Sequence, residues 1–247
     1  MGVPPADTGP LTLHLLGAVD LDGVEGDVAS RLFAQPRLTA LLAVLAVPEP
    51  GRFVRRDRVV GLLWPDLDQS HARAALRKAV HAIRSALGDD VIVSRGDEDI
   101  ALNAARVTCD AARFAAAIEA SRLAEALDLY DGELMPGFHL AECAEFDRWL
   151  EDERAAIRER ASGAAWALAR RYEESQQLSD AAVWARRAVR LSWSDERGIR
   201  RALTMLERLG DRAGAVRLYD DFARRLKADL EVEPSPETQA LAARLRA

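Results

Sequence analysis

The sequence has few cysteines, no long apolar segment and no basic leader, and each absence excludes a class of protein. Cys109 and Cys143 are the only cysteines among 247 residues, too few for a disulfide framework or a four-ligand zinc site. No run of 18 or more apolar residues occurs, so we expect no membrane-spanning helix. The first ten residues, MGVPPADTGP, lack the basic and apolar regions of a signal peptide. We therefore expect a cytoplasmic protein without a membrane partner.

Motifs for catalysis and nucleotide hydrolysis are also missing. No two of the four histidines form H-x-x-x-H, and neither G-x-S-x-G nor G-x-x-x-x-G-K-[ST] occurs. Glu142 and Glu145 have the i,i+3 spacing that is common on surface helices. We expect no enzyme activity, no metal and no cofactor.

Charge is distributed unevenly along the chain. Apolar residues make up 49% of the sequence, enough for one large or two modest domains, and the net charge is −6. One window is nevertheless basic: Arg52, Arg55, Arg56, Arg58, Arg73, Arg77, Lys78 and Arg84 are opposed only by Asp57, Asp66 and Asp68. Because salt screens distant charges, such a cluster attracts phosphate even on an acidic protein. An ordinary solvated helix face is the alternative.

The first half of the chain has the pattern of short strands mixed with helices. Alternating leucines and turn glycines predict two or three antiparallel strands over residues 11–35. Three prolines predict a mobile tail over residues 1–10. Helices are expected over residues 37–47, 56–63 and 70–87, followed by a hairpin with strands at 91–94 and 99–102.

The helix expected over residues 70–87 has one apolar face and one basic face. Arg73, Arg77 and His81 recur every four residues and share a stripe, with Ser70 and Arg84 on the same side. Solvent-facing helices usually mix charges of both signs, because oppositely charged pairs stabilise them. The absence of any Asp or Glu from this helix favours an anionic partner.

The second half is helical throughout. We expect helices at 110–119, 121–130, 142–173, 178–191, 195–208, 211–228 and 236–245. A weak 34-residue repeat aligns Ala181 with Ala215 and Ala188 with Phe222. A period of 34 is typical of tetratricopeptide helix pairs, although alanine-rich helices also match one another by chance.

Four segments carry a resemblance to a known family. They are residues 55–88 with L-W-P before the basic helix, residues 127–160, residues 210–241 with E-x-E-P-S-P-E-T, and the repeat between them. Together they resemble the SARP family of bacterial transcriptional activators over residues 11–246. The family often has Pro where this chain has Trp193, and the ATPase module of its larger members is missing.

The resemblance implies a mainly α fold in two domains. An OmpR-type winged helix-turn-helix, with small antiparallel sheets and a wing hairpin, is expected over residues 11–106. A tetratricopeptide-like bacterial transcriptional activation domain is expected over residues 107–247.

The resemblance also implies binding to double-stranded DNA, with the third helix in the major groove. Arg73 and Arg77 are expected to read bases, because Arg pairs bidentately with guanine O6 and N7. The further DNA-binding candidates are Ser70, Lys78, His81 and Arg84 on the helix, Arg95 on the wing, and Arg52, Arg55 and Arg56 before the second helix.

Further partners follow from the resemblance. The segment 64–69 is assigned to RNA polymerase, with Trp64, Asp66 and Asp68 facing a sigma factor. The alternative is that Trp64 lies in the core and Asp68 caps the third helix. A nucleoid-associated homodimer on direct repeats near promoters is also implied.

Two other interpretations stay open at this point. A helical scaffold with weak or no DNA binding agrees with the net charge of −6. The other interpretation is that the repeat domain binds a small ligand in a groove lined by aromatic side chains, namely Trp166, Tyr172, Trp184, Trp193 and Tyr219. Aromatic residues at helical spacing, however, more often belong to a core. The helical pattern continues to the last residue without a cap, which also fits a fragment of a longer polypeptide.

Overall fold

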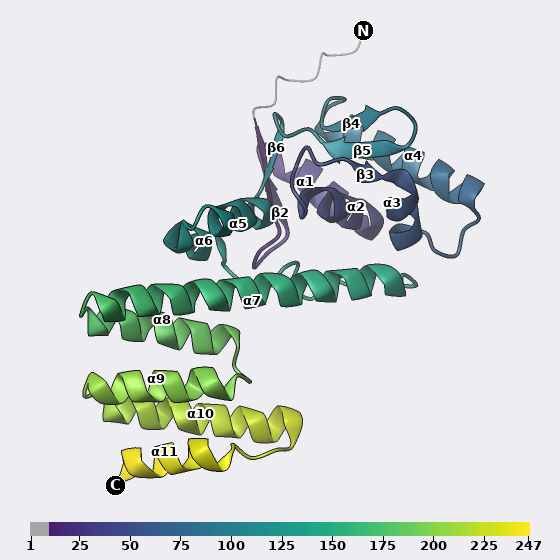
Figure 1. Ribbon diagram of the computed structural model, residues 1–247. Helices are drawn as coiled ribbons and strands as arrows, with labels where there is room; N and C mark the ends of the chain where they lie inside the picture. Colours follow the sequence, from purple (N-terminus) through teal and green to yellow (C-terminus); the bar gives the residue numbers. More distant parts are fainter. Residues whose placement is uncertain (1–9) are drawn as a thin grey trace. The chain divides into compact units, whose positions relative to one another are not determined.

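The computed structural model describes residues 10–247, so the tail predicted for residues 1–10 falls almost wholly outside it. The chain forms two compact units (Figure 1). The first holds the residues up to Ala120 together with Asp128–Ala155, and the second holds Ser121–Leu127 together with Ala156–Ala247. The predicted domain limits at 106 and 107 stay a prediction.

A three-stranded sheet begins the first unit. Its order is β2 (Asp20–Asp22), β1 (Leu11–His14), β6 (Val107–Cys109). β1 pairs with β2 in antiparallel fashion, as expected, but it pairs with β6 in parallel. The parallel pair was not expected, because it joins segments more than 90 residues apart and no local pattern encodes it.

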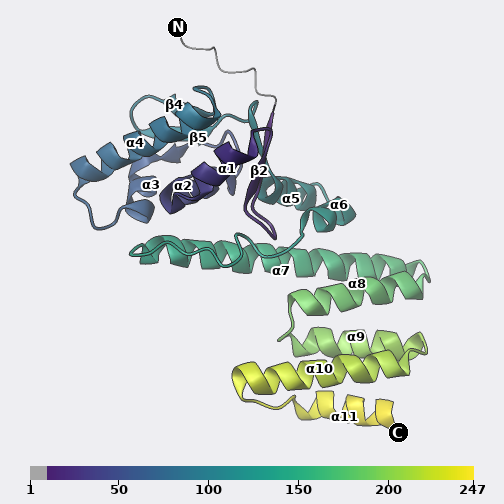
Figure 2. The same cartoon turned by 180° about the vertical axis from the view of Figure 1, so that it is seen from behind.

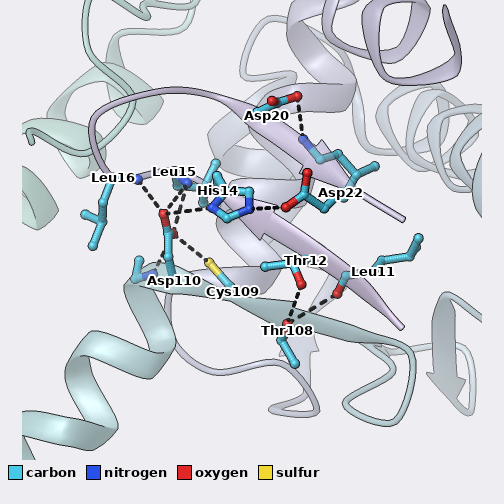
Figure 3. A network of polar contacts seen from close by, with 12 residues as sticks. Leu11, Thr12, His14, Leu15, Leu16, Asp20, Asp22, Thr108, Cys109 and Asp110 are labelled. Carbon is cyan, nitrogen blue, oxygen red and sulfur yellow. Dashed lines mark hydrogen bonds and ion pairs between the residues drawn. The ribbon is translucent and has the colours of Figure 1, made fainter. Parts of the chain in front are cut away.

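Asp110, the first residue of α5 (Asp110–Glu119), fastens this sheet to the helix that follows it (Figure 3). Its buried carboxylate accepts hydrogen bonds from the backbone N–H groups of Leu15 at 2.9 Å, Leu16 at 3.0 Å and Ala111 at 2.7 Å. His14 of β1 bonds to Asp22 of β2 at 2.9 Å. Burial raises the pKa of the neighbouring Cys109 to about 12, so this thiol is neutral.

The strand prediction for residues 26–33 is wrong, because this segment is helix α1 (Gly26–Phe33). Its Ala29 and Leu32 are buried at i,i+3 spacing, and Asp27 pairs with Arg31 at i,i+4. The largely buried α2 (Pro36–Ala46) follows, with Pro36 in its first turn, close to the helix predicted over 37–47.

Among residues 10–247, no single helix is long and apolar enough to cross a membrane. The helices α1 and α2 reach that length only when taken together, and they are bent by 99° at the break between them.

The helix-turn-helix and its wing follow as predicted. The elements are β3 (Val54–Arg55), α3 (Arg56–Leu63), α4 (Gln69–Leu87), β4 (Ile92–Arg95) and β5 (Asp99–Leu102). β4 and β5 form the antiparallel hairpin, and β3 joins its other edge in the order β3-β5-β4. Gly88 ends α4 with a φ of +110°, a backbone conformation that favours glycine.

The second unit is a stack of helices (Figure 2). It holds most of the short α6 (Leu123–Leu129) and, from Ala156 on, the long α7 (Ala144–Glu174). The helices α8 (Leu178–Leu191), α9 (Glu196–Arg208), α10 (Arg212–Leu230) and α11 (Pro236–Arg246) follow. The repeat positions Ala181, Ala215 and Phe222 are buried in one core. Trp166, Tyr172, Trp184, Trp193 and Tyr219 pack in or against this core, as the alternative to an aromatic groove expects.

The motif P-S-P-E-T docks α11 on α9. The carboxylate of Glu196 accepts hydrogen bonds from the backbone N–H of Ser235 at 2.9 Å and from the hydroxyls of Ser235 and Thr238. Arg200 donates to the Thr238 oxygen at 2.9 Å. The pKa of Glu196 is lowered because these hydrogen bonds outweigh its desolvation by burial.

Candidate nucleic-acid interface

The helix α4, which the resemblance places in the major groove, begins at a side-chain cap. Asp68 accepts hydrogen bonds from the backbone N–H groups of Ser70 at 3.0 Å and His71 at 3.2 Å, and from the side chains of both residues. The hydrogen bond from the His71 ring, followed by that from Ser70, holds the pKa of Asp68 well below its usual range. Asp68 therefore stays ionised and defines where α4 starts.

Arg73 is held between α3 and the wing. Its guanidinium donates to Asp57 of α3 at 2.8 and 3.2 Å, and Glu98 of the wing lies 3.7 Å away. The hydrogen bond to Asp57 raises the pKa of Arg73. Arg73 therefore has a structural role, and reading a base would require it to leave this pair.

Arg84 and Arg56 also contact the wing. Arg84 donates to the backbone carbonyl of Ile92 at 2.7 and 3.1 Å, which ties the end of α4 to β4. Arg56, the first residue of α3, donates to the Ser94 hydroxyl at 3.0 Å. These bonds fix the wing relative to the two helices.

Acidic side chains of the wing pair with Arg95 and Arg55, which the sequence-based prediction did not take into account. Arg95 pairs with Asp99 at 2.8 Å and lies over the ring of Phe53, 4.5 Å from its centre. Arg55 lies near Glu98 at 3.5 Å. Both arginines are exposed but partly neutralised, so their phosphate attraction is weaker than their sequence positions indicate.

Four of the predicted residues present unopposed polar or cationic side chains. Arg77, Lys78 and His81 are exposed on α4, and none forms a hydrogen bond or ion pair within the described part of the chain. Arg52 is equally exposed and unpaired. Arg58 of α3 shares these properties but was not among the predicted site residues; its place in the basic window was the signal for it.

A pocket of about 590 Å³ lies where α3, α4 and the wing meet. Leu76 and Val80 line it together with His81, the cations Arg56, Arg73, Arg77 and Arg84, and one acid, Asp97. The buried Nε of Arg56 has no hydrogen-bond partner among residues 10–247. Burial and then the charge of Arg84 lower the pKa of Arg56. A phosphate oxygen bound here would accept a hydrogen bond from this Nε, and its negative charge would raise the pKa of Arg56.

The segment assigned to RNA polymerase divides into buried and exposed residues. Trp64 is only 8% exposed and packs in the core, and Asp68 is the cap of α4, as the alternative expects. Asp66, Leu67 and Asp68 are all exposed, but the carboxylate of Asp68 is engaged in the cap. Asp66 and Leu67 are thus exposed without taking part in the cap.

Comparison with known proteins identifies the family. A model described as the bacterial transcriptional activator domain matches residues 97–246, more than half of the chain. The chain belongs to the bacterial transcriptional activator domain family. This match and the fold confirm the resemblance to SARP-type transcriptional activators. A search of curated proteins returned no match.

A solved structure shares the fold of this chain. It is Mycobacterium tuberculosis EmbR in complex with a low-affinity phosphopeptide, with 22% sequence identity and a TM-score of 0.61. The match covers 96% of this chain and 65% of the EmbR chain. At this identity the likeness concerns the fold, and it confirms the prediction of a winged helix-turn-helix followed by tetratricopeptide-like helices.

Proposed function

We propose that this activator binds promoter DNA through α4, as a dimer on direct repeats, and recruits RNA polymerase. In this proposal residues 11–106 form the DNA-binding domain and residues 107–247 the activation domain. The observation that supports it best is the acid-free face of α4, on which Arg77, Lys78 and His81 are exposed and form no hydrogen bond or ion pair with any of residues 10–247. Such a face suits the major groove, where cations meet phosphates and guanine edges.

The contacts divide the predicted site residues into two groups. Arg77, Lys78, His81 and Arg52 are available to DNA without losing a partner, and the exposed Ser70 lies at the start of α4. Arg73 and Arg84 hold the helix against α3 and the wing. Arg56 and the pocket around it suit one backbone phosphate.

The decisive experiment maps binding sites across the genome with the tagged protein. We expect a recurrent direct repeat upstream of promoters, lost in Arg77→Glu/Lys78→Glu. The matched control is Arg170→Glu/Arg171→Glu, which makes the same charge change at exposed, unpaired residues of α7. Background enrichment of the folded wild-type protein would favour the scaffold interpretation instead.

Dimer formation and polymerase recruitment need separate measurements. In analytical ultracentrifugation, DNA with one half-site should bind one protomer, and DNA with two half-sites should bind two.

The variant Asp66→Lys should retain DNA affinity and lose activation in a purified transcription assay, because it reverses the charge beside exposed Leu67. Unchanged activation would remove this segment from the proposal.

A further inference from the structure

The second unit contains a pocket of about 460 Å³ that the DNA-binding proposal does not use. Residues of α8, α9 and α10 line it, with Val189, Ile199 and Phe222 as its apolar surface. Its volume lies within the usual range of small-ligand sites.

Three arginines of this pocket are unpaired. Arg190 of α8 and Arg217 and Arg225 of α10 are exposed, and none forms a hydrogen bond or ion pair with another residue in the range 10–247. Many other arginines of the same unit have acidic partners; examples are Arg208 with Glu173, Arg244 with Glu207 and Arg246 with Asp220. Arg190, Arg217 and Arg225 therefore bring three unpaired guanidinium groups to one pocket.

The two acids that line the pocket are already engaged. Asp211 caps α10 by accepting from the backbone N–H of Gly214 at 2.8 Å, and it pairs with Arg186. The backbone hydrogen bond from Gly214 is the main cause that lowers the pKa of Asp211. Asp221 pairs with Arg224 at 3.1 Å. Within residues 10–247, both carboxylates of the pocket are therefore engaged by other groups, whereas Arg190, Arg217 and Arg225 form no hydrogen bond or ion pair.

The arrangement of these groups indicates the ligand class. Arg217 and Arg225 are eight residues apart, so they lie on one face of α10, and their planar guanidinium groups suit bidentate phosphate contacts. Half-buried Trp193 lines the same pocket and offers an aromatic surface.

We propose that this pocket binds a small phosphorylated ligand of nucleotide size. Its phosphates contact Arg190, Arg217 and Arg225, and its flat base packs against Trp193. The inference is independent of the DNA site, because all of these residues belong to the second compact unit.

Calorimetry on the full chain tests this with two probes, ATP and inorganic pyrophosphate. We expect saturable one-site binding of ATP and binding of pyrophosphate that is about tenfold weaker, because pyrophosphate lacks a base that could stack on the aromatic side chain. Arg217→Glu/Arg225→Glu should weaken ATP binding at least about tenfold, since it removes two charge-assisted contacts. Arg170→Glu/Arg171→Glu, the charge-matched control, should change it less than about twofold.

Several outcomes would overturn the inference. Absence of saturation with millimolar ATP, or equal losses in the pocket variant and the control, would exclude a specific site. Equal affinity for pyrophosphate and ATP would exclude the contact with Trp193. Loss of ATP binding in Arg77→Glu/Lys78→Glu would place the nucleotide on α4 instead. Circular dichroism checks that each variant folds, and Arg217→Gln/Arg225→Gln replaces the glutamate variant if it does not.

Discussion

Arg73 and Arg77 occupy one stripe of α4 but differ in their contacts. Arg73 is bonded to Asp57 and lies near Glu98, whereas Arg77 is exposed and unpaired in the described chain. A free guanidinium can approach a guanine without breaking an existing ion pair. We therefore expect the two arginines to contribute to the proposed DNA binding in different ways.

The variants Arg77→Ala, Arg73→Ala and Asp57→Ala separate these contributions. Arg77→Ala should weaken binding to the preferred site by about tenfold or more and relax base preference, without changing the thermal midpoint. Arg73→Ala and Asp57→Ala should both weaken it modestly, because each frees α4 from α3. Fluorescence anisotropy with specific and scrambled duplexes measures this. Stronger binding by Asp57→Ala would instead show that Arg73 contacts DNA directly.

At the scale of the element, side-chain caps decide where helices start. Asp68 caps α4 and Asp211 caps α10, and in both cases the carboxylate accepts backbone N–H groups that the first turn leaves unpaired. The Glu196 cluster performs a related function between helices, because it places the first turn of α11 on α9.

Asp68→Ala should lower the thermal midpoint at neutral pH. Because the pKa of Asp68 is depressed in the folded chain, its stabilisation is fully present above the unfolded value of about 4 and is lost as the pH falls below it. The deficit of the variant should therefore shrink in melts between pH 6 and pH 2.5. Asp66→Ala, two residues earlier, exposed and outside the cap, is the control and should leave the thermal midpoint at neutral pH nearly unchanged.

Thr238→Val should destabilise the second unit by about 1–3 kcal/mol, because the buried Thr238 hydroxyl donates a hydrogen bond to Glu196 and accepts one from Arg200. Urea unfolding followed by circular dichroism measures the loss. Thr204→Val is the control, since its exposed hydroxyl bonds only to the carbonyl of Arg200 in its own helix. A neutral Thr238→Val would mean that apolar packing of α11 suffices.

At the scale of the whole molecule, Asp110 joins segments from the two ends of the winged-helix sequence. Its carboxylate accepts hydrogen bonds from the backbone N–H groups of Leu15 and Leu16, which are 95 and 94 residues away in the sequence. The parallel β1–β6 pair lies beside it (Figure 3). These hydrogen bonds join residues 11–16, at the start of the first unit, to residues 107–110, which follow the wing.

Asp110→Ala should lower the free energy of unfolding by roughly 2–4 kcal/mol, because it leaves several buried backbone donors unpaired. Asp22→Ala is the control and should cost at most about 1 kcal/mol, since Asp22 is exposed and contacts His14. Guanidinium unfolding gives both values. Similar losses in the two variants would contradict the assigned role of Asp110.

Because the net charge of the chain is −6, only the local basic patch can attract DNA in the proposed complex. Salt screens such contacts, so the affinity should depend on salt. With about four phosphate contacts per protomer, affinity should fall about one hundredfold between 50 and 200 mM salt. Anisotropy titrations over this range give the slope. A slope near zero would be incompatible with phosphate contacts by α4.

Much of the local structure could be predicted from the sequence. The 3.6-residue spacing of apolar side chains placed α3, α4, α8 and the later helices within a few residues, and Gly88 marked the end of α4. Residues 26–33 were missed because nearby turn glycines and a preceding alternating pattern favoured strands. The pairing of Arg73 with Asp57 was also missed, because the partners are 16 residues apart on different helices.

The sequence by itself determined the helical periodicity, the acid-free face of α4 and the family motifs, since these depend on residue order and local spacing. Only the tertiary structure decided which cations remain free, because ion pairs form between elements that the chain brings together from afar. The same folding engaged Arg73 and Arg84, left Arg77 and Lys78 exposed, and gathered Arg190, Arg217 and Arg225 around one pocket.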